Sequence, residues 1–128
     1  MKIDLDRQLV NPDGTPATEM IREGDKAIEK AVTVRYVLMN AMLSQVDGEG
    51  QQIRGEDKIR RYDLWVRLKK AVAKGVMVPD PNPKANERGE VTMVDGGTEF
   101  EPEDITFLRR AVLMYPVLVV GQIREILS

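Results

Sequence analysis

One stretch, FEPEDITFLRRAVLMYP at residues 100–116, constrains the fold more than any other part of the chain. Pro102 suits the first turn of a helix, where its missing N–H and fixed φ cost nothing, and Glu101 stands at the capping position before it. The two acidic residues that follow match the positive end of a helix dipole. Pro116 must break this helix, and the apolar sequence after it restarts as another. Residues 99–128 are therefore predicted to form a pair of helices.

Residues 33–75 are predicted to form a second pair of helices. Thr33 is suited to cap a helix over residues 34–45, because the apolar side chains after it recur at helical spacing. The polar sequence DGEG then ends this helix in a flexible loop. The next helix is predicted to begin near Gly55 and to stop at Gly75.

Two further segments are typical of small β-hairpins. The sequence IDLDRQLV at residues 3–10 begins with alternating apolar and charged residues and leads into NPDG, which favours a turn. Its partner strand is expected somewhere in residues 15–21, and the polar REGDKAIEK after it is predicted to be a connector or a frayed extension. Residues 76–98 contain two β-prone segments, which predict a second hairpin or arm. Its loop, residues 79–90, is rich in Pro and is a candidate contact arm.

These segments predict a single α+β domain over residues 1–128, mainly helical, with about four helices and one or two small β-hairpins. It divides into an N-terminal strand or hairpin with a connector (1–32), a helical hairpin (33–75), a β-hairpin or arm (76–98) and a C-terminal helix pair (99–128). The predicted core consists of apolar residues from every helix: Val37, Leu38, Met42, Ile59, Leu64, Trp65, Leu68, Val72, Ile105, Leu108, Val112, Leu118 and Ile123.

The chain contains no Cys and no His, which excludes disulfides, thiol nucleophiles and every mechanism that depends on imidazole. The acidic pair Asp4 and Asp6 and the acidic helix start at 101–104 are explained by local structure better than by metal binding. The glycines of VDGGTE lack the spacing of a nucleotide-binding loop and indicate a turn. We therefore predict a protein that is not an enzyme, with no catalytic residue, no metal and no cofactor.

The charged start of the chain differs from a signal peptide, and the longest apolar run is shorter than the roughly 20 residues of a membrane span. These features predict a cytoplasmic protein with no membrane partner. The net charge of −2 argues against capture of the whole protein by nucleic acid. Residues 54–74 are nevertheless locally basic. On a helical wheel their narrow polar face contains Arg60, Arg67, Lys70 and Lys74. Contact of this basic stripe with phosphates is the alternative function, and a solvated helix face is the simpler interpretation.

The last segment, VLVVGQIREIL, is apolar on more than one side, and the helix before Gly75 is apolar around most of its circumference. Such an excess either fills the core or docks on a partner, and both interpretations stay open for the last helix. Gly121 is expected to permit close approach of another helix. A self-complementary patch closes most simply as a symmetric dimer. The candidate contact residues are Tyr62, Trp65, Val117, Val120 and Ile123.

The order of these segments resembles a protein family. The chain opens with MKIDLDRQLVNPDGTP, continues through TVRYVLMNAML and GEDKIRRYDLWVRLKKA, and has an acidic helix start that leads to YPVLVVGQIREIL. This order is similar to a family of small hypothetical proteins encoded in tailed-phage and prophage genomes, and it covers nearly the whole chain. The resemblance implies a phage or prophage origin more than an activity. Together with the apolar excess, it leads to the prediction of a phage accessory or morphogenesis protein that binds other protein chains, itself included. It assigns no functional residue.

Overall fold

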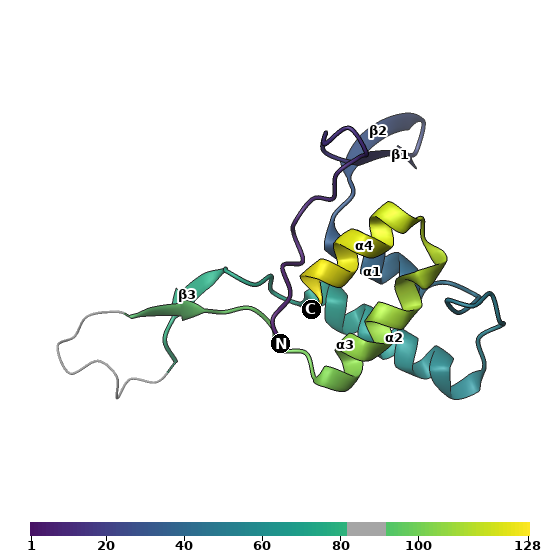
Figure 1. Cartoon of the computed structure of the whole chain (residues 1–128). Helices are drawn as coiled ribbons and strands as arrows, with labels where there is room; N and C mark the ends of the chain where they lie inside the picture. The colour runs from purple at the N-terminus through teal and green to yellow at the C-terminus, as the bar shows by residue number, and fades with distance from the viewer. Residues whose placement is uncertain (82–91) are drawn as a thin grey trace.

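The computed structural model describes residues 1–81 and 92–128. Within them the chain forms four α-helices and two small antiparallel sheets of two strands each, which confirms the predicted, mainly helical α+β class. Figure 1 shows the helices gathered in one body, from which the two hairpins project in different directions. The elements follow the order β1 (Thr18–Glu23), β2 (Lys26–Ala31), α1 (Val34–Met42), α2 (Gly55–Lys70), β3 (Met77–Pro79), β4 (Met93–Asp95), α3 (Pro102–Ala111), the short 3-10 helix η2 (Val112–Met114) and α4 (Val117–Ile126).

The helix starts agree with the capping signals of the sequence. Thr33 caps α1, and its hydroxyl oxygen accepts from the N–H of Tyr36 at 3.2 Å. Pro102 stands at the start of α3, although the Glu101 side chain before it makes no capping hydrogen bond. Pro116 separates η2 from α4, as predicted. Local side-chain chemistry therefore sets the beginnings of these helices.

Both helices of the 33–75 unit end earlier than predicted. α1 stops at Met42, and a hydrogen-bonded turn follows in which one Asp47 carboxylate oxygen accepts from the N–H groups of Glu49 and Gln51 at 2.8 and 2.9 Å. This ordered turn takes the place of the flexible loop. α2 stops at Lys70 and not at Gly75.

The early end of α2 has a tertiary cause. The guanidinium of Arg35 donates to the carbonyls of Leu68 and Ala71 at 2.6 and 2.7 Å. These bonds satisfy carbonyl groups at the end of α2 without a further helical turn. The chain then runs extended from Ala71, and the N–H of Lys74 donates to the carbonyl of Ile3 at 2.8 Å.

The N-terminal segment differs most from its prediction. Residues 3–10 form only isolated bridges, Gln8 with Thr33 and Val10 with Pro16, and not a strand. The turn at NPDG is present, since the N–H of Asn11 donates to the carbonyl of Thr15 at 2.8 Å. The main hairpin lies beyond it, in β1 and β2, so REGDKAIEK forms a turn and a strand and is not a connector.

The register of β1 and β2 explains why this polar sequence forms a hairpin. Ile21 lies opposite Ile28, and acid-base pairs flank them: Glu19 with Lys30 and Glu23 with Lys26. Cross-strand pairs of this kind stabilise two-stranded sheets. Gly24, at φ 62°, supplies the left-handed conformation of the tight turn.

The core lies between the helices and the N-terminal segment. Of the predicted core, Ile59, Val72 and Leu118 are wrong because their side chains are exposed, Ile59 by 65%. Trp65 is half-buried and packs against the core. The predicted residues that are buried are Val37, Leu38, Met42, Leu64, Leu68, Ile105, Leu108, Val112 and Ile123. The large buried apolar residues that were not predicted are Ile3, Leu5, Leu9, Val34, Ile53, Phe100 and Leu127.

Candidate functional site

The predicted contact residues of α4 are divided between its two sides. Val117 is 91% exposed and Val120 is half-buried, whereas Ile123 is completely buried in the core. Ile123 is therefore not available to a partner. Apart from the neighbouring backbone of α4 itself, no described atom lies within 4 Å of the position that a Cβ at Gly121 would occupy, so no other described helix makes the expected close approach there. The apolar residues of α4 are thus divided between the core and the exposed surface.

The aromatic candidates of α2 form a pair. Tyr62 is exposed and Trp65 half-buried, and their ring centroids lie 6.1 Å apart in a stacked arrangement. The ammonium of Lys69 lies 5.2 Å from the Trp65 ring. Trp65 therefore serves mainly as packing, and Tyr62 is the member that a partner could reach.

The basic stripe does not form one continuous surface. Both Arg60 and Arg67 approach the carboxylate of Asp104 on α3, at 3.8 and 2.7 Å. Their guanidinium groups also lie over the rings of Phe107 and Phe100, at 4.4 and 5.2 Å. These contacts join α2 to α3 and engage half of the stripe within the chain.

The other two members of the stripe, Lys70 and Lys74, are exposed. Lys74 follows the end of α2, so it does not share a helix face with the others. The prediction of a common face is wrong because it required α2 to continue to Gly75.

A second basic cluster was not predicted. Arg109 and Arg110 at the end of α3 and Arg124 on α4 line a cavity of about 220 Å³ with Thr106 and Leu113. No acidic side chain lines it, and the buried Nε of Arg109 has no acceptor among the described residues. Only the packing of α4 brings Arg124 to this place, so no spacing in the sequence could have indicated the cluster.

A larger cavity of about 360 Å³ lies between the end of α1, the turn after it and α2. Its apolar wall includes Met42, Leu43 and Ile53, and its polar wall includes Lys58 and Arg61. Burial lowers the pKa of the Arg61 guanidinium, and the nearby carboxylates of Asp57 and Asp47 oppose this shift. This site was not predicted, because only the outer face of α2 was expected to be polar.

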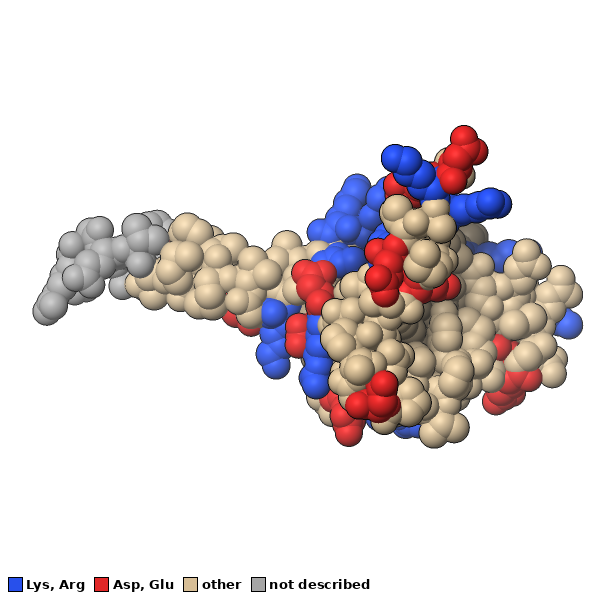
Figure 2. All heavy atoms as spheres, turned by 90° about the horizontal axis from the view of Figure 1, so that it is seen from above, with Lys and Arg blue, Asp and Glu red and all other residues tan. Residues whose placement is uncertain are grey.

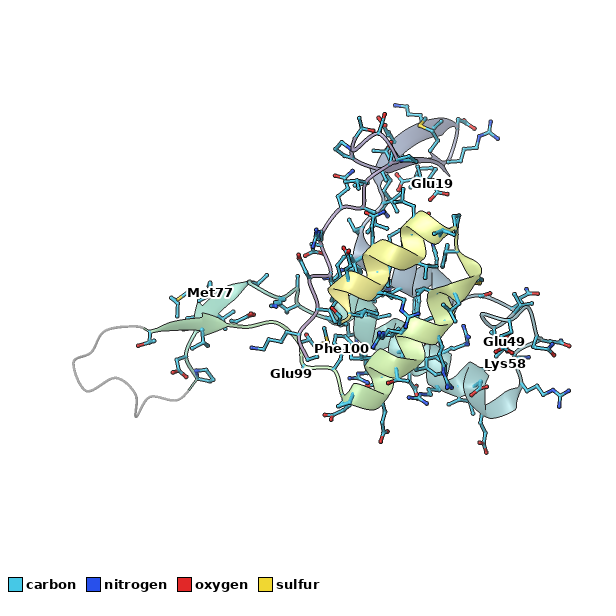
Figure 3. The ribbon with its side chains drawn as sticks, viewed as in Figure 1. Glu19, Glu49, Lys58, Met77, Glu99 and Phe100 are labelled. Atoms are coloured by element: carbon cyan, nitrogen blue, oxygen red, sulfur yellow. The ribbon has the colours of Figure 1, made fainter. Side chains whose placement is uncertain are left out.

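The arm of β3 and β4 is the most protruding feature near the N-terminus in Figure 1. Seen from above in Figure 2, its surface is mostly uncharged, whereas Lys, Arg, Asp and Glu gather at its base and over the body. Met77 and Met93 are 52% and 47% exposed. Figure 3 shows Met77 on the arm, away from the helices. The predicted hairpin is confirmed at its strands, and residues 82–91 of its loop lie outside the described residues.

The base of this arm is held by VDGGTE, which the sequence analysis assigned to a turn. One carboxylate oxygen of Asp95 accepts from the N–H groups of Gly75 and Gly97, at 3.0 and 2.8 Å. These hydrogen bonds lower the pKa of Asp95. A Cβ at Gly96 would lie 2.6 Å from a methyl group of Val78. The two glycines therefore allow close packing at the base, and no turn forms there.

Across residues 1–81 and 92–128, no helix has the length and apolar character needed to cross a membrane. In the same residues, no three acidic side chains come close enough together to hold a metal ion. No family model matches the chain, and neither a curated protein nor a solved structure matches it significantly.

Proposed function

We propose that this chain is a non-enzymatic protein-interaction module, which binds other protein chains, itself included, through the arm of β3 and β4. The observation that carries the proposal is the exposed apolar face of this arm. In the register of the hairpin, Met77, Pro79 and Met93 share one face, with Asp95 opposite Met77 at its base, and both methionines are exposed. Methionine side chains are flexible and polarisable, so they adapt to a partner surface.

The strands of the arm support this proposal in a second way. Each has three residues, and an isolated two-stranded sheet is marginally stable in water. A partner strand added to an open edge would supply backbone hydrogen bonds and stabilise the arm. The open side of α4, with Val117 and Leu118 exposed, is a second contact surface, suited to a symmetric dimer.

The setting of this function is part of the proposal. The resemblance to small tailed-phage proteins favours a phage or prophage accessory or morphogenesis protein that acts in the cytoplasm of a bacterial host. Its partners are then copies of itself or other phage proteins. The location of its gene beside head or tail genes would support this setting.

The arm makes a direct prediction. The double substitution Met77→Lys and Met93→Lys should abolish assembly or partner binding, because it places two charges in the apolar contact. The free energy of unfolding should change by only about 0.5 kcal/mol, since both side chains are exposed. Light scattering over a concentration series measures self-assembly, and co-purification from phage-infected cells measures binding to other proteins.

Met20→Lys is the matched control, because Met20 is also an exposed methionine, on the other hairpin. Val117→Asp separately tests the open side of α4. A wild-type protein that is monomeric at high concentration and brings no partner from infected cells would refute the proposal.

Binding to nucleic acid is the alternative function, and the arginine cluster at the end of α3 favours it. Arg60 and Arg67 are engaged with Asp104. Arg109, Arg110 and Arg124 are therefore better candidates for phosphate contact than the basic stripe. If the protein binds DNA, the double substitution Arg110→Ala and Arg124→Ala should make the salt dependence less steep. The slope of log association constant against log salt concentration should decrease in magnitude by about two. Lys70→Ala with Lys74→Ala is the control, and an equal effect there would return the site to the basic stripe.

A further inference from the structure

Arg61 is a buried cation without a carboxylate partner. Its side chain is 5% exposed, and one terminal nitrogen donates to the carbonyl of Ala41 at 2.7 Å. Within the described residues no carboxylate oxygen lies within 4 Å of it, and its buried Nε has no acceptor. A buried charge without a directly paired counter-charge is costly, because water no longer solvates it. The carboxylates of Asp57 and Asp47 act on Arg61 only from a longer distance. The position of Arg61 therefore requires an explanation.

Two contacts within the protein explain part of the burial of the Arg61 guanidinium. The Ala41 carbonyl belongs to the last turn of α1, where the helix dipole is negative, so Arg61 stabilises the end of that helix. The guanidinium also lies 5.4 Å from the centre of the Phe107 ring. Both contacts fix the orientation of the group, and neither supplies a full negative charge.

Arg61 also lines the 360 Å³ cavity between α1 and α2. Lys58 adds a second positive charge to the lining, and no acidic side chain lines it. Figure 3 shows Lys58 and Glu49 at the same end of the molecule, but no ion pair within 4 Å joins them in the described part of the chain. The cavity thus combines positive charge with the apolar side chains of Met42, Leu43 and Ile53.

We propose that this cavity binds the carboxylate of an apolar C-terminal residue of a partner protein. This proposal rests on the proposed function and names the group that the partner presents. The guanidinium fork matches a carboxylate in shape and charge. A phosphate fits less well, because the apolar wall would leave its remaining oxygens without hydrogen bonds.

The test uses the full chain and a small probe. N-acetylleucine, which carries both an apolar side chain and a carboxylate, is titrated while the Arg61 Nε–H and Ile53 methyl resonances are followed by NMR. N-acetylleucinamide, which lacks the charge, and inorganic phosphate are titrated in parallel. We expect saturable shifts with N-acetylleucine alone. Equal shifts with the amide would overturn the role of Arg61 as a carboxylate ligand, and stronger shifts with phosphate would assign the site to phosphate.

Two variants separate binding from folding. Lys58→Glu changes an exposed side chain of the cavity and should weaken N-acetylleucine binding roughly fivefold or more. Lys69→Glu makes the same change on the same helix beside Trp65 and should leave binding unchanged. Equal effects of the two variants would refute the site. Arg61→Met should abolish the response, and its thermal unfolding shows whether the fold survives.

This test and the test of the arm can fail independently. If the methionine variants lose partner binding but the protein does not respond to N-acetylleucine, the proposed function is supported and the carboxylate site is refuted. A selective response to N-acetylleucine in a protein without any protein partner would remove the proposed function. In that case the cavity would be a site for small carboxylates.

Discussion

Replacing Phe100 with alanine is expected to lower the free energy of unfolding by about 3–5 kcal/mol. Phe100 is 1% exposed and belongs to the core at the point where the chain enters α3. Its ring also lies under the guanidinium of Arg67, and its N–H donates to the carbonyl of Met1 at 2.9 Å. Truncation therefore leaves a cavity between the N-terminal segment, α2 and α3. Denaturant unfolding followed by circular dichroism measures the loss.

Phe107→Ala is the matched control, because it removes the same ring from a half-buried position on α3. Its cost should be about half that of Phe100→Ala, since less apolar surface leaves the core. If the two variants lost equal stability, Phe100 would not be the anchor of α3. The order of the two effects is thus the decisive result.

Replacing Leu5 with alanine should lower the free energy of unfolding by about 2–5 kcal/mol. Leu5 is fully buried, and its carbonyl accepts from the N–H of Arg35 at 2.8 Å, which attaches the N-terminal segment to the start of α1. The variant removes core volume at a site that the backbone holds in place. Chemical denaturation with an unchanged m-value would show a loss of native-state packing alone.

Leu43→Ala makes the identical change at an exposed side chain just after α1. It should alter stability by no more than about 0.5 kcal/mol. Comparable values for Leu5 and Leu43 would mean that the N-terminal segment does not belong to the core. The pair therefore tests a feature that periodicity in the sequence did not indicate.

The predictable part of the fold is the part that depends on neighbouring residues. Thr33 and Pro102 act within one helical turn, and the helix starts were found at both. Pro116 separates two helices for a reason contained in its own ring. The second hairpin was also found, because turn-forming residues separate two short β-prone segments.

Other features depend on residues that are far apart in the sequence. The end of α2 is set by Arg35, which lies before α2 in the chain, on α1. The segment IDLDRQLV has the alternation of a strand, but it contributes Ile3 and Leu5 to a core between helices. A local sequence pattern does not show which distant residues a segment will contact. For this reason α2 was predicted too long, and residues 3–10 were predicted as a strand.

The candidate sites show the same division. Val117 is exposed, as a contact residue must be, whereas Ile123, which was predicted both for the core and for the contact surface, lies in the core. Helical spacing also grouped Arg60 and Arg67 with Lys70 without revealing that both arginines pair with the single carboxylate of Asp104. Arg61 was not predicted as a site residue, because an arginine on a helix is usually solvated. Its burial depends on the packing of α1 and α3, which the sequence around it does not show.

The close packing at the base of the β3–β4 arm has a consequence for recognition. Asp95 accepts two N–H groups there, and Gly96 and Gly97 leave no room for larger residues. The orientation of the arm relative to the helical body is therefore preorganised. A partner that meets the arm loses little affinity to conformational ordering of its base. If the arm binds partners as proposed, differences in affinity between them should arise from the side chains on its outer face.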